Sequence, residues 1–198
     1  MHNILIFGDS ISTGKGVAKD KSWPVLLGKH FDKQNRYSPL VHNLSFPGES
    51  TKEVVKRFPF EVKTRVKKGS KTSVIFAVGI NDAKCVEKET NPSTTEEVFK
   101  ENIGFLIRSA QEYADDIAFV GLSSVDEKKT LPAGSIYFSN ERIARYSHMI
   151  KDVCDESGVL FIDLEKDFNT NFLAEDGIHL NNLGHQMIAD KVISLYLL

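Results

Sequence analysis

Five short hydrophobic runs are spread along the 198-residue chain, and segments with helical spacing separate them. The runs are NILIF at 3–7, LVHNL at 40–44, SVIFAV at 73–78, IAFVGL at 117–122 and VLFIDL at 159–164. They are too short for helices and rich in β-branched and aromatic residues, which is typical of strands buried on both faces. The pattern therefore predicts five strands.

Helix-start signals lie between these runs. The candidates are Ser22 followed by Pro24, the pair Ser50 and Glu53, and the pair Ser93 and Glu96. Both pairs fit the capping box, in which each side chain binds a backbone N–H that the helix leaves unpaired. We therefore expect helices that begin near these three positions.

Further signals mark the later helices and their ends. Helical spacing covers 95–114, 139–157 and a last segment through Leu195 that Asn181 or Asn182 should cap. Pro59 should end or kink the second helix, because proline lacks the N–H that a helix interior needs. Gly158 is a suitable C-terminal stop, because glycine readily adopts the left-handed conformation found there.

Strands that alternate with helices predict a parallel sheet covered by helices on both faces. We expect a three-layer α/β/α, flavodoxin-like fold with a five-stranded sheet in the order 2-1-3-4-5. Ligands bind at the carboxyl ends of the strands in such folds. No internal repeat or linker interrupts the pattern, so residues 1–198 are expected to form a single domain.

Composition narrows the functional classes. The chain has 25 Lys and Arg against 27 Asp and Glu, so it lacks the basic character of a nucleic-acid or anionic-membrane binder. Cys85 and Cys154 are not in a CxxC pair suited to zinc or redox chemistry. No run approaches the length of a membrane span, and the apolar run 4–7 is too short for a signal peptide. We expect a cytoplasmic protein.

Small and polar residues gather where the predicted strands end. The segments are Gly8-Asp9-Ser10, the stretch from Asn43 to Gly48, Gly79-Ile80-Asn81-Asp82, and Asp176-Gly177-Ile178-His179 before the last helix. Because the carboxyl ends of parallel strands share one edge of the sheet, these four segments should converge on one crevice.

The residue types in this crevice suggest acyl-transfer chemistry. A serine such as Ser10 becomes a nucleophile when a base removes its proton, and His179 is the obvious base. Asp176, three residues earlier, is close enough to orient the imidazole. The backbone N–H groups of Ser10 and Gly48 and the side-chain amide of Asn81 are candidate donors to an oxyanion.

The four segments resemble the sequence blocks of the SGNH hydrolases, also called the GDSL esterase/lipase family. The chain carries GDS after the first strand, an N…G segment after the second, GxND after the third and DxxH before the last helix. The resemblance implies Ser10 as nucleophile, His179 as base and Asp176 as its partner, with an oxyanion hole from Ser10, Gly48 and Asn81. Two details differ from the family pattern: Ile11 replaces a leucine, and Phe46-Pro47 stiffen the loop before Gly48.

Other residues near these blocks have simpler interpretations. Ser10 alone would be a common helix cap, and Asp9 and Asp82 are expected to bond nearby backbone or loop groups. The spacing of His185 from His179 is not a zinc signature. The segment Gly14-Lys15-Gly16 resembles a phosphate loop but has the wrong spacing and lacks the Ser or Thr that binds Mg²⁺.

These observations predict a serine esterase or acylhydrolase that cleaves a small carboxylic ester or thioester, with a short acyl group, through an acyl-enzyme on Ser10. No cofactor or metal is needed, and no nucleic-acid partner or membrane span is expected. The alternatives are a non-enzymatic small-ligand binder, a lysophospholipase or thioesterase for longer acyl groups, and a phosphate-ester hydrolase. The loops 123–138 and 83–92 are expected to shape the pocket, although Leu131, Tyr137 and Phe138 fit a satellite core slightly better.

Overall fold

The computed structural model describes residues 2–32 and 39–196. Its main sheet has five parallel strands: β1 (His2–Gly8), β2 (Leu40–Asn43), β3 (Lys71–Ala77), β5 (Asp116–Val120) and β7 (Leu160–Ile162). They are arranged in the order β2-β1-β3-β5-β7, with β1 paired in parallel to both β2 and β3. When only these five strands are counted, the order is 2-1-3-4-5, so the predicted fold class and topology are confirmed.

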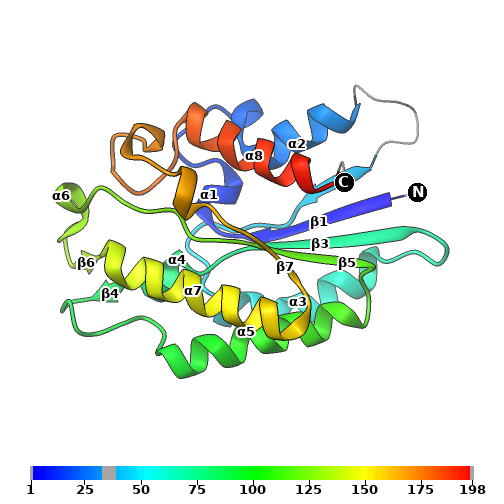
Figure 1. Ribbon diagram of the computed structural model, residues 1–198, viewed down its shortest axis with the longest axis horizontal. Helices are drawn as coiled ribbons and strands as arrows, with labels where there is room; N and C mark the ends of the chain where they lie inside the picture. Colours follow the sequence, from blue (N-terminus) through cyan, green and yellow to red (C-terminus); the bar gives the residue numbers. More distant parts are fainter. Residues whose placement is uncertain (1, 33–38, 197–198) are drawn as a thin grey trace.

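Helices cover both faces of this sheet (Figure 1). One face carries α2 (Trp23–Asp32) and α8 (Asn182–Tyr196), and the other carries α3 (Thr51–Arg65), α5 (Glu96–Gln111) and α7 (Asn140–Ser157). Strand β1 shows why residues 4–7 are all apolar. Its alternate residues Leu5 and Phe7 pack with the α3 side, while Ile4 and Ile6 pack with the α2 side. All four are fully buried, and each contributes roughly 1.5–3 kcal/mol of hydrophobic stabilisation.

The second predicted helix does not end at Pro59. Helix α3 continues to Arg65, six residues further on. An interior proline costs about 3 kcal/mol. Phe58 and Val62, on either side of Pro59, are completely buried against the sheet. The burial of these side chains outweighs the cost of the proline, so of the two outcomes expected for Pro59, an end or a kink, the end is excluded.

The predicted capping box at Ser93 was wrong. Helix α5 begins at Glu96, and its N-cap is Thr95, whose side chain accepts the Val98 N–H. Ser93 instead donates its backbone N–H to the Lys84 carbonyl and lies in the preceding loop. Three other capping signals are confirmed: Ser50 and Glu53 form a complete capping box, Gly158 ends α7 in the left-handed conformation, and Asn181 accepts backbone N–H groups at the start of α8. Helix α2 begins directly after Ser22, as expected.

Short elements gather at the carboxyl edge of the sheet (Figure 1). They are α1 (Ser10–Thr13), α4 (Ile80–Ala83), α6 (Glu127–Thr130), β4 (Cys85–Val86) and β6 (Ile136–Tyr137). Strands β4 and β6 pair antiparallel and join the two loops that were expected to shape the pocket, 83–92 and 123–138. In the part of the chain that the structure describes, the remaining elements are three short 3₁₀ helices at Lys19–Lys21, Glu165–Asp167 and Thr170–Phe172.

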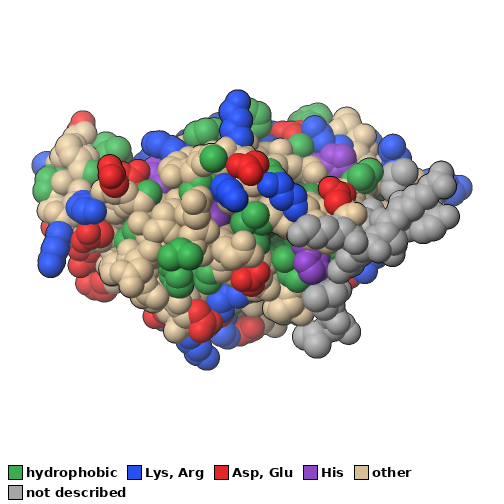
Figure 2. Space-filling model, turned by 90° about the horizontal axis from the view of Figure 1, so that it is seen from above, with side chains coloured by type: hydrophobic (Ala, Val, Ile, Leu, Met, Phe, Trp, Pro, Cys, Tyr) green, Lys and Arg blue, Asp and Glu red, His purple; other side chains and the backbone are tan. Residues whose placement is uncertain are grey.

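The face formed by α2 and α8 carries positive and negative side chains interspersed, with hydrophobic side chains in small separate groups (Figure 2). Among the helices within 2–32 and 39–196, none is both long enough and apolar enough to cross a membrane.

Candidate active site

Ser10 lies at the sharp turn between β1 and α1. The Asp9 side chain accepts the Ile11 N–H at 2.9 Å and so caps α1, as expected for this residue. A Cβ at position 8 would lie 2.5 Å from the Ser12 Oγ and 2.7 Å from the Ala77 backbone oxygen. Glycine is therefore required before Asp9, because the turn packs directly against the end of β3.

Ser10, His179 and Asp176 form a continuous chain of hydrogen bonds. The Ser10 Oγ lies 2.8 Å from the His179 Nε2, and the His179 Nδ1 lies 2.5 Å from the Asp176 Oδ2. The other carboxylate oxygen of Asp176 accepts the backbone N–H groups of Ile178 and His179, at 3.0 and 2.9 Å. The segment therefore fixes its own aspartate and histidine relative to each other, and the fold brings His179 to Ser10 from 169 positions away in the sequence.

The electrostatics of Asp176 favour the charged carboxylate. Partial burial alone would raise its pKa, but hydrogen bonds from the His179 ring and from two backbone N–H groups outweigh burial and lower it. An ionised Asp176 accepts the Nδ1 proton of His179, so that the Nε2 keeps a lone pair facing the Ser10 hydroxyl. This arrangement is able to take a proton from Ser10 and to stabilise the resulting imidazolium.

Gly48 lies in a β-turn formed by residues 46–49. The Glu49 N–H bonds to the Phe46 carbonyl at 3.4 Å, and Gly48 has a φ of +82°. Proline second and a positive φ third are the pattern of a type II turn, which explains why Phe46-Pro47 precede the glycine. A Cβ at position 48 would meet nothing within 4 Å, so glycine is needed there for its backbone conformation rather than for space.

Asn81 lies in the first turn of α4 and is largely buried. Its Nδ2 donates to the Glu49 carbonyl at 2.9 Å, and its Oδ1 accepts from the Lys84 Nζ at 3.3 Å. These two contacts fix the orientation of the amide. A side-chain amide has two N–H groups, and the Glu49 carbonyl occupies one of them, which leaves the second for a ligand.

Ser10, Gly48, Asn81 and His179 all line one open pocket of about 330 Å³. The remaining lining residues are mostly apolar, with two lysines: Ile11, Lys15, Pro47, Ile80, Lys84, Ile136, Phe138 and Ile178. Asp176 does not line the pocket and lies behind His179. The structure thus brings the predicted nucleophile, base and oxyanion donors to one cavity.

The two predicted loops contribute to this pocket through Lys84, Ile136 and Phe138. Phe138 also belongs to the main hydrophobic core, so it serves both of the roles considered for it. Leu131 and Tyr137 do not line the pocket. Both are partly buried, and neither belongs to the two hydrophobic clusters of the structure, so the satellite-core interpretation of the 123–138 loop stays a prediction for them.

Two buried aspartates adjoin candidate site residues: Asp9 directly precedes Ser10, and Asp82 directly follows Asn81. Burial raises the pKa of Asp9 to about 7, and the nearby Asp82 and Glu49 add to this effect. Asp82 accepts the Thr51 N–H at 2.9 Å and the Thr51 hydroxyl at 2.6 Å, so it fastens the start of α3 to α4. Its role is structural, as the sequence indicated.

His185 and Gly14 have structural roles as well. The His185 Nδ1 accepts the Trp23 N–H at 3.3 Å between α8 and α2, and burial lowers its pKa to about 4. Gly14 is the left-handed C-cap of α1, which accounts for a glycine of the segment that resembles a phosphate loop. Within the described ranges, no cluster of three or more His, Cys, Asp or Glu residues is arranged to hold a metal ion.

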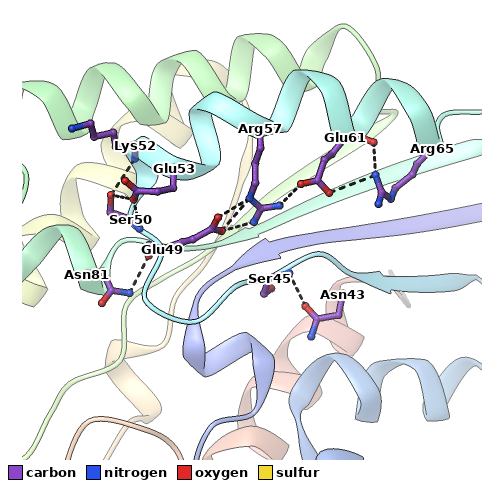
Figure 3. A network of polar contacts seen from close by, with 10 residues as sticks. All are labelled: Asn43, Ser45, Glu49, Ser50, Lys52, Glu53, Arg57, Glu61, Arg65 and Asn81. Atoms are coloured by element: carbon purple, nitrogen blue, oxygen red, sulfur yellow. Dashed lines mark hydrogen bonds and ion pairs between the residues drawn. The ribbon is translucent and has the colours of Figure 1, made fainter.

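Sequence reasoning missed the residues that support Asn81. Glu49, Lys84 and Arg57 form contacts around it, and Figure 3 shows the chain of polar contacts from Asn81 through Glu49 to Arg57 on α3. The i,i+4 spacing of Arg57 and Glu61 is typical of an ion pair on a helix surface, so this contact could have been predicted from the sequence. The contact between Glu49 and Asn81 spans 32 residues and has no local sequence signature.

The parallel sheet and the aligned serine, histidine and aspartate define a class of α/β proteins with a Ser–His–Asp arrangement at the carboxyl edge of the sheet. Within that class, the chain belongs to the GDSL-like lipase/acylhydrolase family, whose model matches residues 6–187. This is a family of carboxylic ester hydrolases. The chain matches no curated protein sequence.

Several solved structures share the fold over nearly the whole chain. A lipase/acylhydrolase from Enterococcus faecalis is 22% identical, with a TM-score of 0.77 and coverage of 98% of this chain and 94% of that one. An acetylxylan esterase from Geobacillus stearothermophilus is 15% identical, with a TM-score of 0.74 and coverage of 97% and 92%. A Pseudoalteromonas esterase inhibited by monoethylphosphonate is 17% identical, with a TM-score of 0.72 and coverage of 98% of both chains.

Proposed function

We propose that this protein is a serine esterase that hydrolyses small carboxylic esters or thioesters with short acyl groups. The observation that carries the proposal is the hydrogen-bonded chain from Ser10 through His179 to Asp176, with its serine end open to a pocket that Gly48 and Asn81 also line. A serine that only capped α1 would have no need of this alignment. The family assignment supports the same reaction.

The geometry supports a two-step reaction. The Ser10 Oγ attacks the carbonyl carbon while the His179 Nε2 takes its proton, and Asp176 stabilises the imidazolium. The oxyanion accepts hydrogen bonds from the Ser10 and Gly48 backbone N–H groups and from the second N–H of Asn81. The alcohol leaves with the proton from His179. Water, activated by the same histidine, then releases the acid and restores Ser10.

The size and the walls of the pocket support a short acyl group. A volume of about 330 Å³ lies at the small end of the range for ligand sites of about 300–1,000 Å³. Two of the structural relatives named above are described as esterases, and one of these as an acetylxylan esterase. We propose esters from acetyl to about butyryl as substrates. A series of nitrophenyl esters from acetate to decanoate tests this, because kcat/KM that rises steadily with chain length would contradict it.

Substitution of the nucleophile tests the reaction itself. Ser10→Ala should abolish hydrolysis of nitrophenyl esters, because no other group supplies the acyl-accepting oxygen. Ser123→Ala is a matched control, since the Ser123 hydroxyl is also buried but has no hydrogen-bond partner in the structure. Undiminished hydrolysis by Ser10→Ala would exclude the mechanism. Absence of hydrolysis by the wild-type protein would favour the small-ligand binder instead.

A further inference from the structure

The turn that carries Gly48 is held by a side chain from α3. The Glu49 carboxylate points away from Asn81 and toward Arg57, whose guanidinium binds it through two nitrogens (Figure 3). The Nε–Oε1 distance is 2.9 Å and the Nη2–Oε2 distance is 2.5 Å. Both side chains are largely buried, with exposed fractions of 17% for Arg57 and 13% for Glu49.

The same guanidinium contacts the other end of the turn. Its central carbon lies 5.0 Å from the centre of the Phe46 ring and 5.3 Å from the centre of the Phe7 ring. Phe46 is the first residue of the turn and Glu49 is the last. Arg57 therefore contacts both residues that flank Pro47 and Gly48, and it also contacts the strand that leads to Ser10.

We propose that Arg57 is a positioning residue for the oxyanion hole. It holds the 46–49 turn so that the Gly48 N–H and, through the Glu49 carbonyl, the Asn81 amide are both in place before the substrate arrives. The inference rests on the proposed esterase function, and it adds a residue that touches neither the substrate nor the reacting atoms.

The physical reason is that Pro47 and Gly48 themselves have little other support, although the Phe46 N–H donates to the Gly8 carbonyl at 3.0 Å and the Glu49 carbonyl accepts from Asn81. Pro47 and Gly48 are exposed, and no atom lies within 4 Å of the position of a Gly48 Cβ. Oxyanion donors are effective only when they are fixed at about 2.7–3.1 Å from the developing charge. A bidentate arginine–carboxylate pair fixes geometry in two directions, which a single lysine contact does not.

Helix α3 is a rigid platform for this contact. Its buried residues Phe58 and Val62 follow Arg57 along the helix, and the capping box at Ser50 fixes its start. Arg57 also binds Glu61 at 2.7 Å, which orients the guanidinium from the opposite side. The contact chain then continues to Arg65, which binds Glu61 but not Glu49 in the structure.

Arg65 provides the matched control, because it lies on the same helix, in the same network, two turns away from the site. In Arg57→Met, kcat for a short nitrophenyl ester should fall about tenfold or more while KM changes less than about threefold, because only the transition state needs the oxyanion donors. Arg65→Met should keep kcat within about twofold. Arg57→Lys should restore part of the loss, because it keeps the charge but not the two-nitrogen contact.

A double variant separates geometry from charge. In Arg57→Met alone, the Glu49 carboxylate loses its partner near the site, and its negative charge would by itself disfavour an oxyanion. Glu49→Gln combined with Arg57→Met removes that charge. The proposal predicts that kcat stays low in the double variant, because the turn is still not held. Recovery to the wild-type kcat would overturn the positioning role and assign the loss to charge.

An NMR comparison tests the same claim without activity. The Gly48 backbone amide and the Asn81 side-chain amide should shift or broaden in Arg57→Met and stay unchanged in Arg65→Met. Equal spectra and equal kcat in the two variants would overturn the inference. If the wild-type protein hydrolyses no ester, the proposed function fails, and the amide signals still decide whether Arg57 positions the turn. If Arg57→Met does not fold, Arg57→Lys and Glu49→Gln carry the comparison.

Discussion

The two sides of Ser10 are built in different ways. On the base side, Asp176 and His179 are three residues apart, and backbone N–H groups of the same segment hold the carboxylate. On the oxyanion side, Gly48 and Asn81 come from two loops, and the contact between Glu49 and Asn81 links them across 32 residues. The base side is thus organised locally, whereas the oxyanion side depends on the packing of α3 and α4. We therefore expect substitutions of Asp176 or His179 to lower kcat most. Substitutions on the oxyanion side should lower kcat less, but residues further from Ser10 should also have an effect there.

Removal of the base tests the first half of this comparison and should have the largest effect. His179→Ala leaves Ser10 without a proton acceptor, so kcat should fall about 10⁴-fold or more in steady-state assays of nitrophenyl acetate hydrolysis. The exposed histidine in His148→Ala, which lies near Glu165, is a control that should retain full activity. A loss of less than about tenfold in His179→Ala would show that another group acts as the base.

Removal of the side-chain donor tests the second half. Asn81→Ala should lower kcat about 10²- to 10³-fold with a smaller change in KM, as for other single oxyanion donors. The measurement is a full kinetic profile, with Asn91→Ala in the nearby loop as the control. An unchanged kcat would remove Asn81 from the oxyanion hole and would leave the two backbone donors.

Substitution of Gly48 tests the conformation of the turn alone, because an added Cβ would meet no neighbouring side chain and acts only through the positive φ. Gly48→Ala should lower kcat about tenfold, since an alanine resists the positive φ of this turn and shifts the N–H. Gly48→Asn should be less harmful, because asparagine tolerates a positive φ better than alanine does. Equal kcat values for the two variants would indicate that the turn conformation does not control the donor.

The smallest effect concerns Asp9, whose side chain caps the short helix α1 that begins at Ser10. Burial raises the pKa of Asp9 to about 7 in the folded protein, well above the ordinary value of an aspartate, so between about pH 4 and pH 7 the native protein holds a proton that the unfolded chain has released. The free energy of unfolding should therefore fall as pH rises from about 4 to about 7. Asp9→Asn keeps the acceptor for the Ile11 N–H but removes this titration.

Urea denaturation at pH 4 and pH 8 measures the effect. Relative to the wild type, Asp9→Asn should gain stability at pH 8 and little at pH 4. The exposed Asp152→Asn is the control and should show no such difference. A gain for Asp9→Asn that is equal at both pH values would contradict the assignment of a raised pKa to Asp9.

The sequence predicts the sheet well because its strands are buried on both faces. The run at 3–7 is apolar at every position except Asn3, and the structure places its alternate residues in two separate cores. The Ser10, Asp176 and His179 arrangement is predictable for a related reason. Ser10 follows the end of β1, Asp176 and His179 lie together in the turn before α8, and the fold then brings the two segments to the same edge of the sheet.

Features that depend on tertiary packing were not predictable in this way. Pro59 carries a local signal to end α3, but the burial of Phe58 and Val62 against the sheet overrides it. The support of the oxyanion side was missed for the same kind of reason. Arg57 and Glu49 are eight residues apart, and only the path of the loop into α3 brings their side chains together.

The central claim is that Ser10 is an activated nucleophile. The most direct measurement is intact-protein mass spectrometry, followed by peptide mapping, after incubation with a fluorophosphonate that reacts only with activated serines. We predict one phosphonate adduct per chain, located on Ser10, in the wild type and in Ser123→Ala, and none in Ser10→Ala or His179→Ala. An unmodified wild-type protein, or an adduct on a different serine, would contradict this claim.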